Sequence, residues 1–223
     1  MRPSIIYEDN HLLVVEKPVN IPVQADNTRD MDLLTVLKQY VKETYNKPGE
    51  VYLGLVHRLD RPVGGIMVFA RTSKAAARLS DQIRTRTFKK TYHAVVRGIP
   101  AKTKATLRDF LLKNEVTNMV SVVKEGTKEA KEAILDYEVL KSAEELSLLR
   151  INLHTGRPHQ IRVQLSHAGY ILYGDQRYGS RVNKAGQQIA LWAHQVNFEH
   201  PTKKEMLSFS CDTPKTEPWL IFE

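Results

Sequence analysis

A carboxylate between two arginines is the feature of this sequence with the clearest chemical potential. Asp60 lies between Arg58 and Arg61. The segment 62–65, Pro-Val-Gly-Gly, is typical of a turn, and the apolar run 66–70 is typical of a buried strand. A carboxylate held on a turn at a strand edge can act as a nucleophile or a general base. The alternative is a polar loop in which Asp60 only accepts hydrogen bonds from nearby amides.

Two residues far along the chain, Arg162 and Tyr92, could act with this carboxylate. An arginine beside a buried carboxylate keeps it ionised. Arg162 is on a predicted helix whose other face is apolar, although a solvated helical arginine is the more common case. Tyr92 lies in a predicted strand, out of phase with Thr91 and His93, as a core tyrosine would. Spacing alone leaves both alternatives open.

Other arrangements of reactive residues are missing from the sequence. His154 and His159 are five positions apart, and no His-x3-His or His-Glu-x2-His pattern occurs, so we expect no metal site. A Gly-x-Ser-x-Gly elbow and the glycine-rich phosphate loops are also missing. The single cysteine, Cys211, excludes an internal disulfide framework and a cysteine-based metal site.

The charge of the chain is concentrated in one segment. The 223 residues are 42% hydrophobic and 26% charged, as in an ordinary globular protein, and the formal net charge is +8. Residues 71–104 hold ten Lys and Arg against the single acid Asp81, a net charge of +9. Such a segment favours a polyanionic partner. No signal peptide or apolar stretch of membrane-spanning length occurs, so we expect a cytoplasmic protein with no membrane contact.

The elements that must position Asp60, Tyr92 and Arg162 are mostly strands. Apolar patterns predict strands at 5–7, 12–17, 88–97, 105–111, 117–123, 134–140, 146–153 and 191–199. Most of these strands are connected as hairpins, which predicts an α+β fold with a largely antiparallel sheet. No repeat, low-complexity tract or linker occurs, so we expect a single domain over 1–223.

Three helices are predicted between these strands. The first is capped by Asp30 or Asp32, and the second is capped by Thr72 or Ser73 and continues to about Arg84. The third has Pro158 in its first turn. The residues expected on their inner faces are Leu33, Leu37, Tyr40 and Val41 in the first, Ala76, Leu79 and Ile83 in the second, and Ile161, Leu165 and Ala168 in the third.

Five motifs in order give the chain a resemblance to the RluA-type pseudouridine synthases, which isomerise uridine in structured RNA. They are 12–18 (Leu-Leu-Val-Val-Glu-Lys-Pro), 57–60 (His-Arg-Leu-Asp), 90–98 (Lys-Thr-Tyr-His-Ala-Val-Val-Arg-Gly), 155–162 (Thr-Gly-Arg-Pro-His-Gln-Ile-Arg) with 174–175 and 178–179, and 191–193 with 198–201. Each motif is weakly or moderately specific, but the ordered set is highly specific. The first motif begins at residue 12, so we expect a catalytic domain without the small RNA-binding domain that many relatives carry in front.

The resemblance implies a fold and a set of roles. The fold is the pseudouridine synthase fold, with a mixed, mainly antiparallel sheet flanked by helices and an active site in a central cleft. Asp60 would be the catalytic carboxylate, Tyr92 the aromatic residue against the target base, and Arg162 the partner of Asp60. Arg58 matches the family arginine implicated in taking the base out of the stack. No cofactor or metal is implied.

The implied partner is structured RNA, a stem-loop of ribosomal or transfer RNA, bound by a monomer. The residues expected to contact it are Arg58, Lys74, Arg78, Arg84, Lys89, Lys90, Arg157 and His159. Two other functions stay open at this point. One is a catalytically inactive RNA-binding or RNA-chaperone protein that keeps the fold, and the other is a glycosylase that hydrolyses the same bond.

The chain departs from the family pattern at two places. Val63-Gly64-Gly65 stands where Thr-Ser-Gly is usual, which removes two hydroxyl groups from the loop after Asp60. Asn20 stands where a glycine is usual after Lys-Pro, and asparagine tolerates the left-handed backbone conformation that glycine adopts there. Neither change touches a proposed catalytic group, so they affect loop geometry and substrate choice rather than the reaction class.

Overall fold

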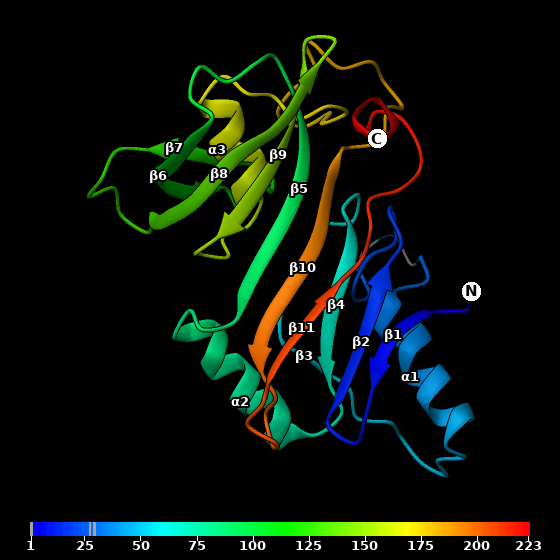
Figure 1. The fold of residues 1–223 in the computed structure, drawn as a ribbon. Coiled ribbons are helices and arrows are strands. Elements are labelled where there is room, and N and C mark those ends of the chain that lie inside the picture. The colour runs from blue at the N-terminus through cyan, green and yellow to red at the C-terminus, as the bar shows by residue number, and fades with distance from the viewer. Residues whose placement is uncertain (1, 27, 29) are drawn as a thin grey trace. The chain divides into compact units, whose positions relative to one another are not determined.

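A computed structural model describes residues 2–26, 28 and 30–223, and the chain forms two compact units. The first unit comprises the chain up to Lys89 together with Ala193–Asp212. The second unit comprises Lys90–Trp192 together with Thr213–Glu223. Figure 1 shows the course of the chain through both.

The first unit is built on antiparallel strands. Its elements are β1 (Ser4–Glu8), β2 (Leu12–Lys17), α1 (Leu33–Thr44), β3 (Gly54–Leu55), β4 (Gly64–Ala70), α2 (Ser73–Arg84), most of β10 (Leu191–Glu199) and β11 (Met206–Ser210). β2 pairs with β1 on one side and with β4 on the other, while β3 also pairs with β4 and β11 pairs with β10. α2 packs against β3 and β4.

The core of this unit lies on β2 and β4. Leu12–Val15 and Ile66–Ala70 are completely buried. These are the continuous apolar runs of the sequence, and a strand buried on both faces needs such a run rather than an alternating pattern. β4 is therefore a rigid support for the turn that precedes it, which contains Asp60.

Both helices of the first unit begin at one of the two residues expected for each. Asp32 caps α1 by accepting a hydrogen bond from Thr35 N at 3.0 Å, and Thr72 caps α2 by accepting from Ala75 N at 3.1 Å. The inner face of α2 differs by one position from the prediction, because Ala75 rather than Ala76 is buried with Leu79. Likewise, Val36 joins Leu33, Leu37 and Val41 inside α1, while Tyr40 is half-buried.

The second unit is an antiparallel sheet covered by one helix. Its elements are β5 (Lys89–Arg97), β6 (Lys104–Lys113), β7 (Val120–Val123), β8 (Lys131–Ala143), β9 (Leu146–Leu153), α3 (Gln160–His167) and the short 3-10 helix η1 (Trp219–Phe222). The strand order is β5-β9-β8-β6-β7, and every neighbouring pair in it is antiparallel. α3 packs against β6 and β7 (Figure 1). The predicted α+β fold with a mixed, mainly antiparallel sheet is confirmed.

α3 is not the helix with one apolar face that the sequence predicts. All residues from Gln160 to Leu165 are buried, and Pro158 lies in the turn before the helix rather than in its first turn. Buried polar side chains bond to one another instead of facing water. Gln160 Nε2 donates to Gln164 Oε1 at 3.0 Å, and Gln164 Nε2 donates to Asp109 Oδ2 on β6 at 2.8 Å. These bonds fix the helix that carries Arg162.

The first unit also contains a hydrogen-bonded aspartate that makes its stability sensitive to acid. Burial raises the pKa of Asp9, but hydrogen bonds from His11 N, His200, Leu12 N and Tyr7 outweigh burial and lower it from 3.8 to about 2. His200 is completely buried, and its Nε2 lies 2.8 Å from Asp9 Oδ2. Its Nδ1 accepts from Thr202 N and Lys203 N, so the Nε2 proton is the one donated to Asp9.

We therefore expect acid to remove a stabilisation of about 2 kcal/mol that comes from Asp9. The native pKa lies below the unfolded value, so the stabilisation is complete above that value and is lost as the pH falls towards 2. Urea unfolding between pH 2 and 6 measures this effect. Asp9→Asn should be less stable than wild type at pH 6, and the difference should shrink in acid. A difference that is the same at every pH would contradict the assignment.

Candidate active site

Asp60 lies on a turn that leads directly into the buried strand β4. Its side chain is half-buried, and Val63 N closes the turn by donating to Asp60 O at 3.0 Å. A second contact fixes the chain before the turn, because His57 Nε2 accepts a hydrogen bond from Val68 N of β4 at 3.0 Å. An accepting Nε2 requires the neutral imidazole. Backbone and side-chain bonds on both sides of Asp60 therefore hold it rigidly.

A buried lysine, which the sequence analysis did not identify as a functional residue, holds the same turn. Lys17 is completely buried, and its Nζ donates to three backbone carbonyls, those of Pro18 at 2.9 Å, Arg61 at 3.0 Å and Val63 at 2.7 Å. Burial lowers the pKa of Lys17 to about 7, the charge of Asp60 opposes that shift, and Arg61 adds to it. The sequence contains a signal for this role of Lys17. The lysine is in phase with the buried residues of a strand and lies directly before a proline.

Gly65 and Asn20 both have positive φ angles, which explains the type of residue at each position. Gly65 has a φ of +116°, and a Cβ there would lie 2.3 Å from Ala193 O and 2.6 Å from Ala193 N, so only glycine fits. Asn20 has a φ of 64°, which confirms the prediction that it adopts the left-handed conformation. Arg61 Nε donates to Asn20 O at 3.3 Å and so connects the Asp60 turn to the Lys-Pro motif.

Arg162 forms a buried, two-point ion pair with Asp175 in the second unit. Nε lies 2.8 Å from Oδ2 and Nη2 lies 2.7 Å from Oδ1, and the side chains are 7% and 1% exposed. Burial raises the pKa of Asp175, but the Arg162 hydrogen bonds and charge and the N–H groups of Tyr178 and Arg177 outweigh it and lower the pKa below its ordinary value. The alternative of a solvated helical arginine is wrong. The two-point contact fixes the plane of the guanidinium.

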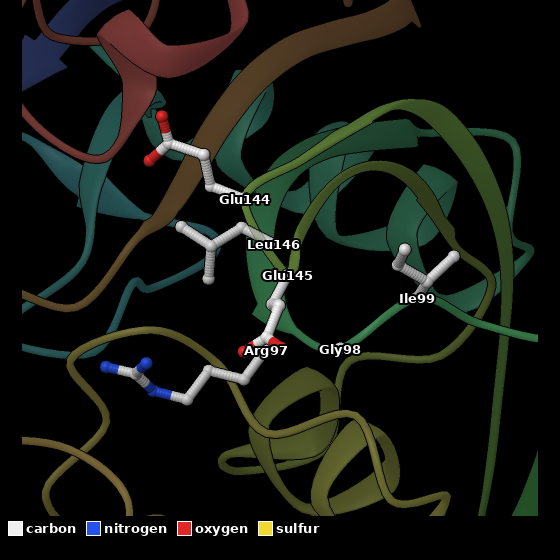
Figure 2. A pocket seen from close by; sticks show the side chains of 6 residues that line it. All are labelled: Arg97, Gly98, Ile99, Glu144, Glu145 and Leu146. Atoms are coloured by element: carbon white, nitrogen blue, oxygen red, sulfur yellow. The ribbon is translucent and has the colours of Figure 1, made fainter.

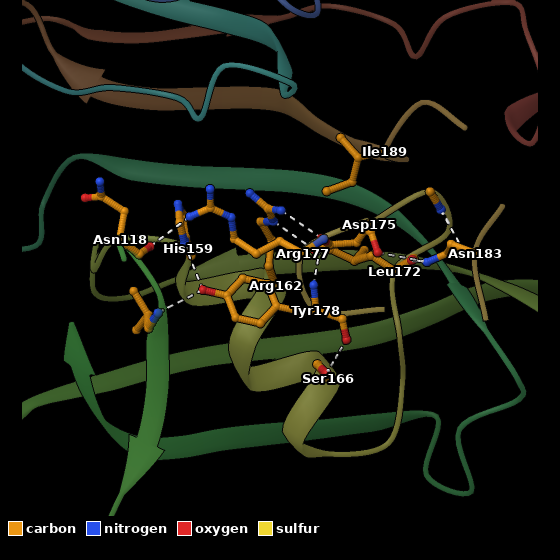
Figure 3. A network of polar contacts seen from close by, with 12 residues as sticks. Asn118, His159, Arg162, Ser166, Leu172, Asp175, Arg177, Tyr178, Asn183 and Ile189 are labelled. Carbon is orange, nitrogen blue, oxygen red and sulfur yellow. Dashed lines mark hydrogen bonds and ion pairs between the residues drawn. The ribbon is translucent and has the colours of Figure 1, made fainter. Parts of the chain in front are cut away.

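A tyrosine supports this pair from one side, as Figure 3 shows. The ring of Tyr178 lies 5.4 Å from the Arg162 guanidinium, and its hydroxyl accepts from Val120 N at 3.1 Å. The same hydroxyl lies 2.8 Å from His159 Nδ1. Sequence reasoning singled out neither Asp175 nor Tyr178, although the Gly-Asp and Tyr-Gly pairs of the third motif contain them.

Tyr92 is buried in β5 and is only 7% exposed. It lies opposite Ile151 of β9, which in turn lies opposite Tyr137 of β8, and all three are buried. This environment is the one expected of a core tyrosine. The catalytic role of Tyr92 stays a prediction, as does the partnership of Arg162 with Asp60, because Asp60 belongs to the first unit and the other two belong to the second.

The predicted RNA contacts fall into two groups. Arg58, Lys74 and Lys89 are exposed, and so is Arg84, which forms an ion pair with Asp81. The other predicted contacts are engaged within the protein. Arg78 donates to Pro201 O, Arg157 Nε donates to Glu132 O at 2.8 Å, and burial lowers the pKa of Lys90. His159 belongs to this second group through Tyr178. The exposed group is therefore better placed to meet a phosphate backbone.

Two cavities have linings that include none of Asp60, Tyr92 and Arg162. One, of about 510 Å³, lies in the second unit beside the β8–β9 turn and is lined by Arg97, Gly98, Ile99, Glu144, Glu145 and Leu146 (Figure 2). The other, of about 420 Å³, lies along α2 in the first unit and is lined by Ala77, Arg78, Asp81, Gln82, Thr85, Thr87, Glu199 and Lys204. Each combines basic and acidic side chains, so neither is a simple phosphate site.

Among residues 2–26, 28 and 30–223, no cluster of three or more His, Cys, Asp or Glu side chains could hold a metal ion. No helix within those residues is long and apolar enough to cross a membrane.

Comparison with known proteins places these residues in a family. The family model described as RNA pseudouridylate synthase matches residues 11–167, a range that contains Asp60, Tyr92 and Arg162. An uncharacterized RNA pseudouridine synthase of Aquifex aeolicus is 33% identical over 96% of this chain and 70% of its own length. The ribosomal large subunit pseudouridine synthase D of Pseudomonas aeruginosa is 33% identical over 98% of this chain and 70% of its own length.

A solved structure supports the fold. The human RNA pseudouridylate synthase domain containing 4 aligns with a TM-score of 0.80 and 24% identity, over 95% of this chain and 89% of its own. At that identity the likeness shows the fold alone. The sequence matches carry the further step: this chain belongs to the RNA pseudouridylate synthase family, whose members are isomerases that act on RNA.

Proposed function

We propose that this protein isomerises uridine to pseudouridine in ribosomal RNA, with Asp60 as the catalytic carboxylate. The observation that carries the proposal is the family match over 11–167, which includes Asp60, Tyr92 and Arg162. Two features of the structure support it. The Asp60 turn is held by Lys17, and the Arg162 guanidinium is held by Asp175. Both charged groups are fixed in advance, as catalysis by positioned charges requires.

The reaction exchanges one glycosidic bond for another. The bond between uracil N1 and ribose C1′ breaks, the base rotates, and a bond forms between C5 and C1′. The proton on C5 leaves and N1 gains one, so the product has the mass of the substrate. Ionised Asp60 either attacks the nucleotide covalently or removes a ribose proton to form a glycal. Water must be kept from the separated fragments, because it would hydrolyse them.

Arg162 and Tyr92 complete the proposed centre. The positive charge of Arg162 keeps Asp60 ionised. Asp175 in turn fixes the orientation of the Arg162 guanidinium. Tyr92 packs against the base and assists removal of the C5 proton. The two compact units would then act together as one catalytic domain over 1–223.

Binding of the RNA is proposed to depend on the exposed cations. A stacked base is out of reach of Asp60, so the target uridine must leave the stack, and Arg58 would take part in this step. Lys74, Arg84 and Lys89 would hold phosphates, and the affinity for RNA would then fall as salt is added. We further propose that the protein works as a monomer in the cytoplasm and that a transfer RNA stem-loop is the second candidate substrate.

Pseudouridine mapping in RNA from cells with and without the protein tests the proposal. One or more sites, in ribosomal or transfer RNA, should be lost without the protein. Purified protein should restore them on a transcript of that RNA with no change in mass. Free uracil in that reaction would instead identify a glycosylase. Binding without any change in the RNA would identify an inactive RNA-binding protein.

A further inference from the structure

We propose that Lys17 is a positioning residue whose protonated ammonium sets the shape of the Asp60 turn, so that the reaction slows when this ammonium loses its proton. The inference rests on the proposed role of Asp60. Lys17 does not touch the reacting atoms in this account. It acts through the backbone of the residues that follow Asp60.

The hydrogen bonds of Lys17 match the ammonium form. An ammonium has three N–H donors, and Nζ contacts three carbonyls, those of Pro18, Arg61 and Val63, at 2.7–3.0 Å. A neutral amine has two donors and a lone pair, so one of the three carbonyls would face the lone pair. Two of the three belong to the Asp60 turn. Loss of the proton therefore loosens the turn or its connection to the Lys-Pro motif.

Burial and Arg61 favour loss of this proton, whereas Asp60 and the three carbonyl acceptors favour the ammonium form. The charged groups that act on Nζ are Asp60 and Arg61, both from the turn. Gly65, which lies directly opposite Lys17 on β4, has no side chain, and Glu16 precedes Lys17 in β2 and so projects to the other face. Burial is the largest influence and brings the pKa of Lys17 to about 7.

Stability and activity should respond to this titration in opposite directions. Between the native pKa and the ordinary value of 10.5, the unfolded chain holds the Lys17 proton and the native chain has lost it. Folding is therefore favoured further as the pH rises above 7. If Lys17 affected stability alone, activity would not fall in the pH range where stability rises. A positioning residue of this kind loses activity while its contribution to stability grows.

Single-turnover rates of tritium release from RNA with 5-tritiated uridine, measured from pH 6 to 9, test the inference. The wild-type rate should fall above about pH 7 with the loss of one proton. Lys17→Met should be slower than wild type at pH 6 and should lack this fall. Lys42→Met, which removes an exposed lysine from α1, should keep the wild-type profile. Denaturant unfolding should show wild type gaining stability relative to Lys17→Met between pH 7 and 9.

A flat wild-type profile, or the same fall in Lys17→Met, would overturn the inference. If Lys17→Met does not fold, the carbon-13 resonances of the lysine Cε atoms in wild type decide the question. A lysine Cε resonance that titrates near neutral pH, and that is still present in Lys90→Met, supports the inference. A Cε resonance of Lys17 that titrates above pH 9 overturns the inference. Activity retained by Asp60→Asn in the same assay would be a failure of the proposed function itself, distinguishable from either result for Lys17.

Discussion

Asp60→Asn should lower the rate of tritium release from RNA with 5-tritiated uridine by at least about a thousandfold, because the reaction needs the ionised carboxylate as nucleophile or base. The substitution keeps the size of the side chain. The turn should also keep its shape, since bonds through the backbone of Asp60, Arg61 and Val63 hold it. Affinity for the RNA should be largely unchanged, because exposed cations provide it.

The matched control for this variant is Asp212→Asn. Asp212 is an exposed aspartate of the same unit, so its replacement by asparagine removes the same charge from the surface. Its rate and RNA affinity should equal those of wild type. Normal tritium release by Asp60→Asn would end the catalytic assignment, and a loss of RNA binding in that variant would show that Asp60 acts in binding instead.

Asp175→Asn should destabilise the protein by about 3–5 kcal/mol, because it leaves the Arg162 guanidinium buried without its carboxylate. Asp175 Oδ1 also accepts from Arg177 N at 2.9 Å and from Tyr178 N at 3.2 Å, so the turn that carries Tyr178 is affected as well. The residual folded protein should release tritium more slowly, since Arg162 is no longer held in one orientation. Urea unfolding and single-turnover rates measure the two effects.

A double variant separates the role of this pair in stability from its role in activity. Arg162→Met combined with Asp175→Leu replaces both buried charges with apolar side chains, which often recovers much of the stability lost when one partner is removed. The double variant should therefore be more stable than Asp175→Asn and yet inactive. Activity in the double variant would contradict the role of Arg162, and a wild-type stability of Asp175→Asn would contradict the importance of the ion pair.

The strands and two of the helices were predictable because local sequence determines them. The apolar runs at 12–15 and 66–70 have the pattern of buried strands, and the structure buries them completely. Asp32 and Thr72 have the side chains that cap helices, so they also fix where α1 and α2 begin. Asn20 has the left-handed conformation expected from the resemblance, in which a glycine is usual at its position. None of these features depends on a partner far away in the sequence.

The supports of the candidate site were missed because they depend on contacts distant in the sequence. Lys17 meets carbonyls 44 and 46 residues away, and its type gave no sign of burial. Arg162 is buried because Asp175, on a loop beyond its helix, forms an ion pair with it. Arg78 donates to Pro201 O, 123 residues away, and its contact with RNA stays a prediction. Charged residues are mostly exposed, so burial of this kind follows from tertiary partners rather than from residue type.

We propose that Asp60 and Arg162 act together in the isomerisation of uridine. A double-mutant cycle with the mild substitutions Asp60→Glu and Arg162→Lys tests it most directly, read by single-turnover tritium release. Groups that act together show effects that do not multiply, so the double variant should depart from the product of the single effects by about tenfold or more. Single effects that multiply to within about twofold would contradict the claim, because independent sites behave in that way.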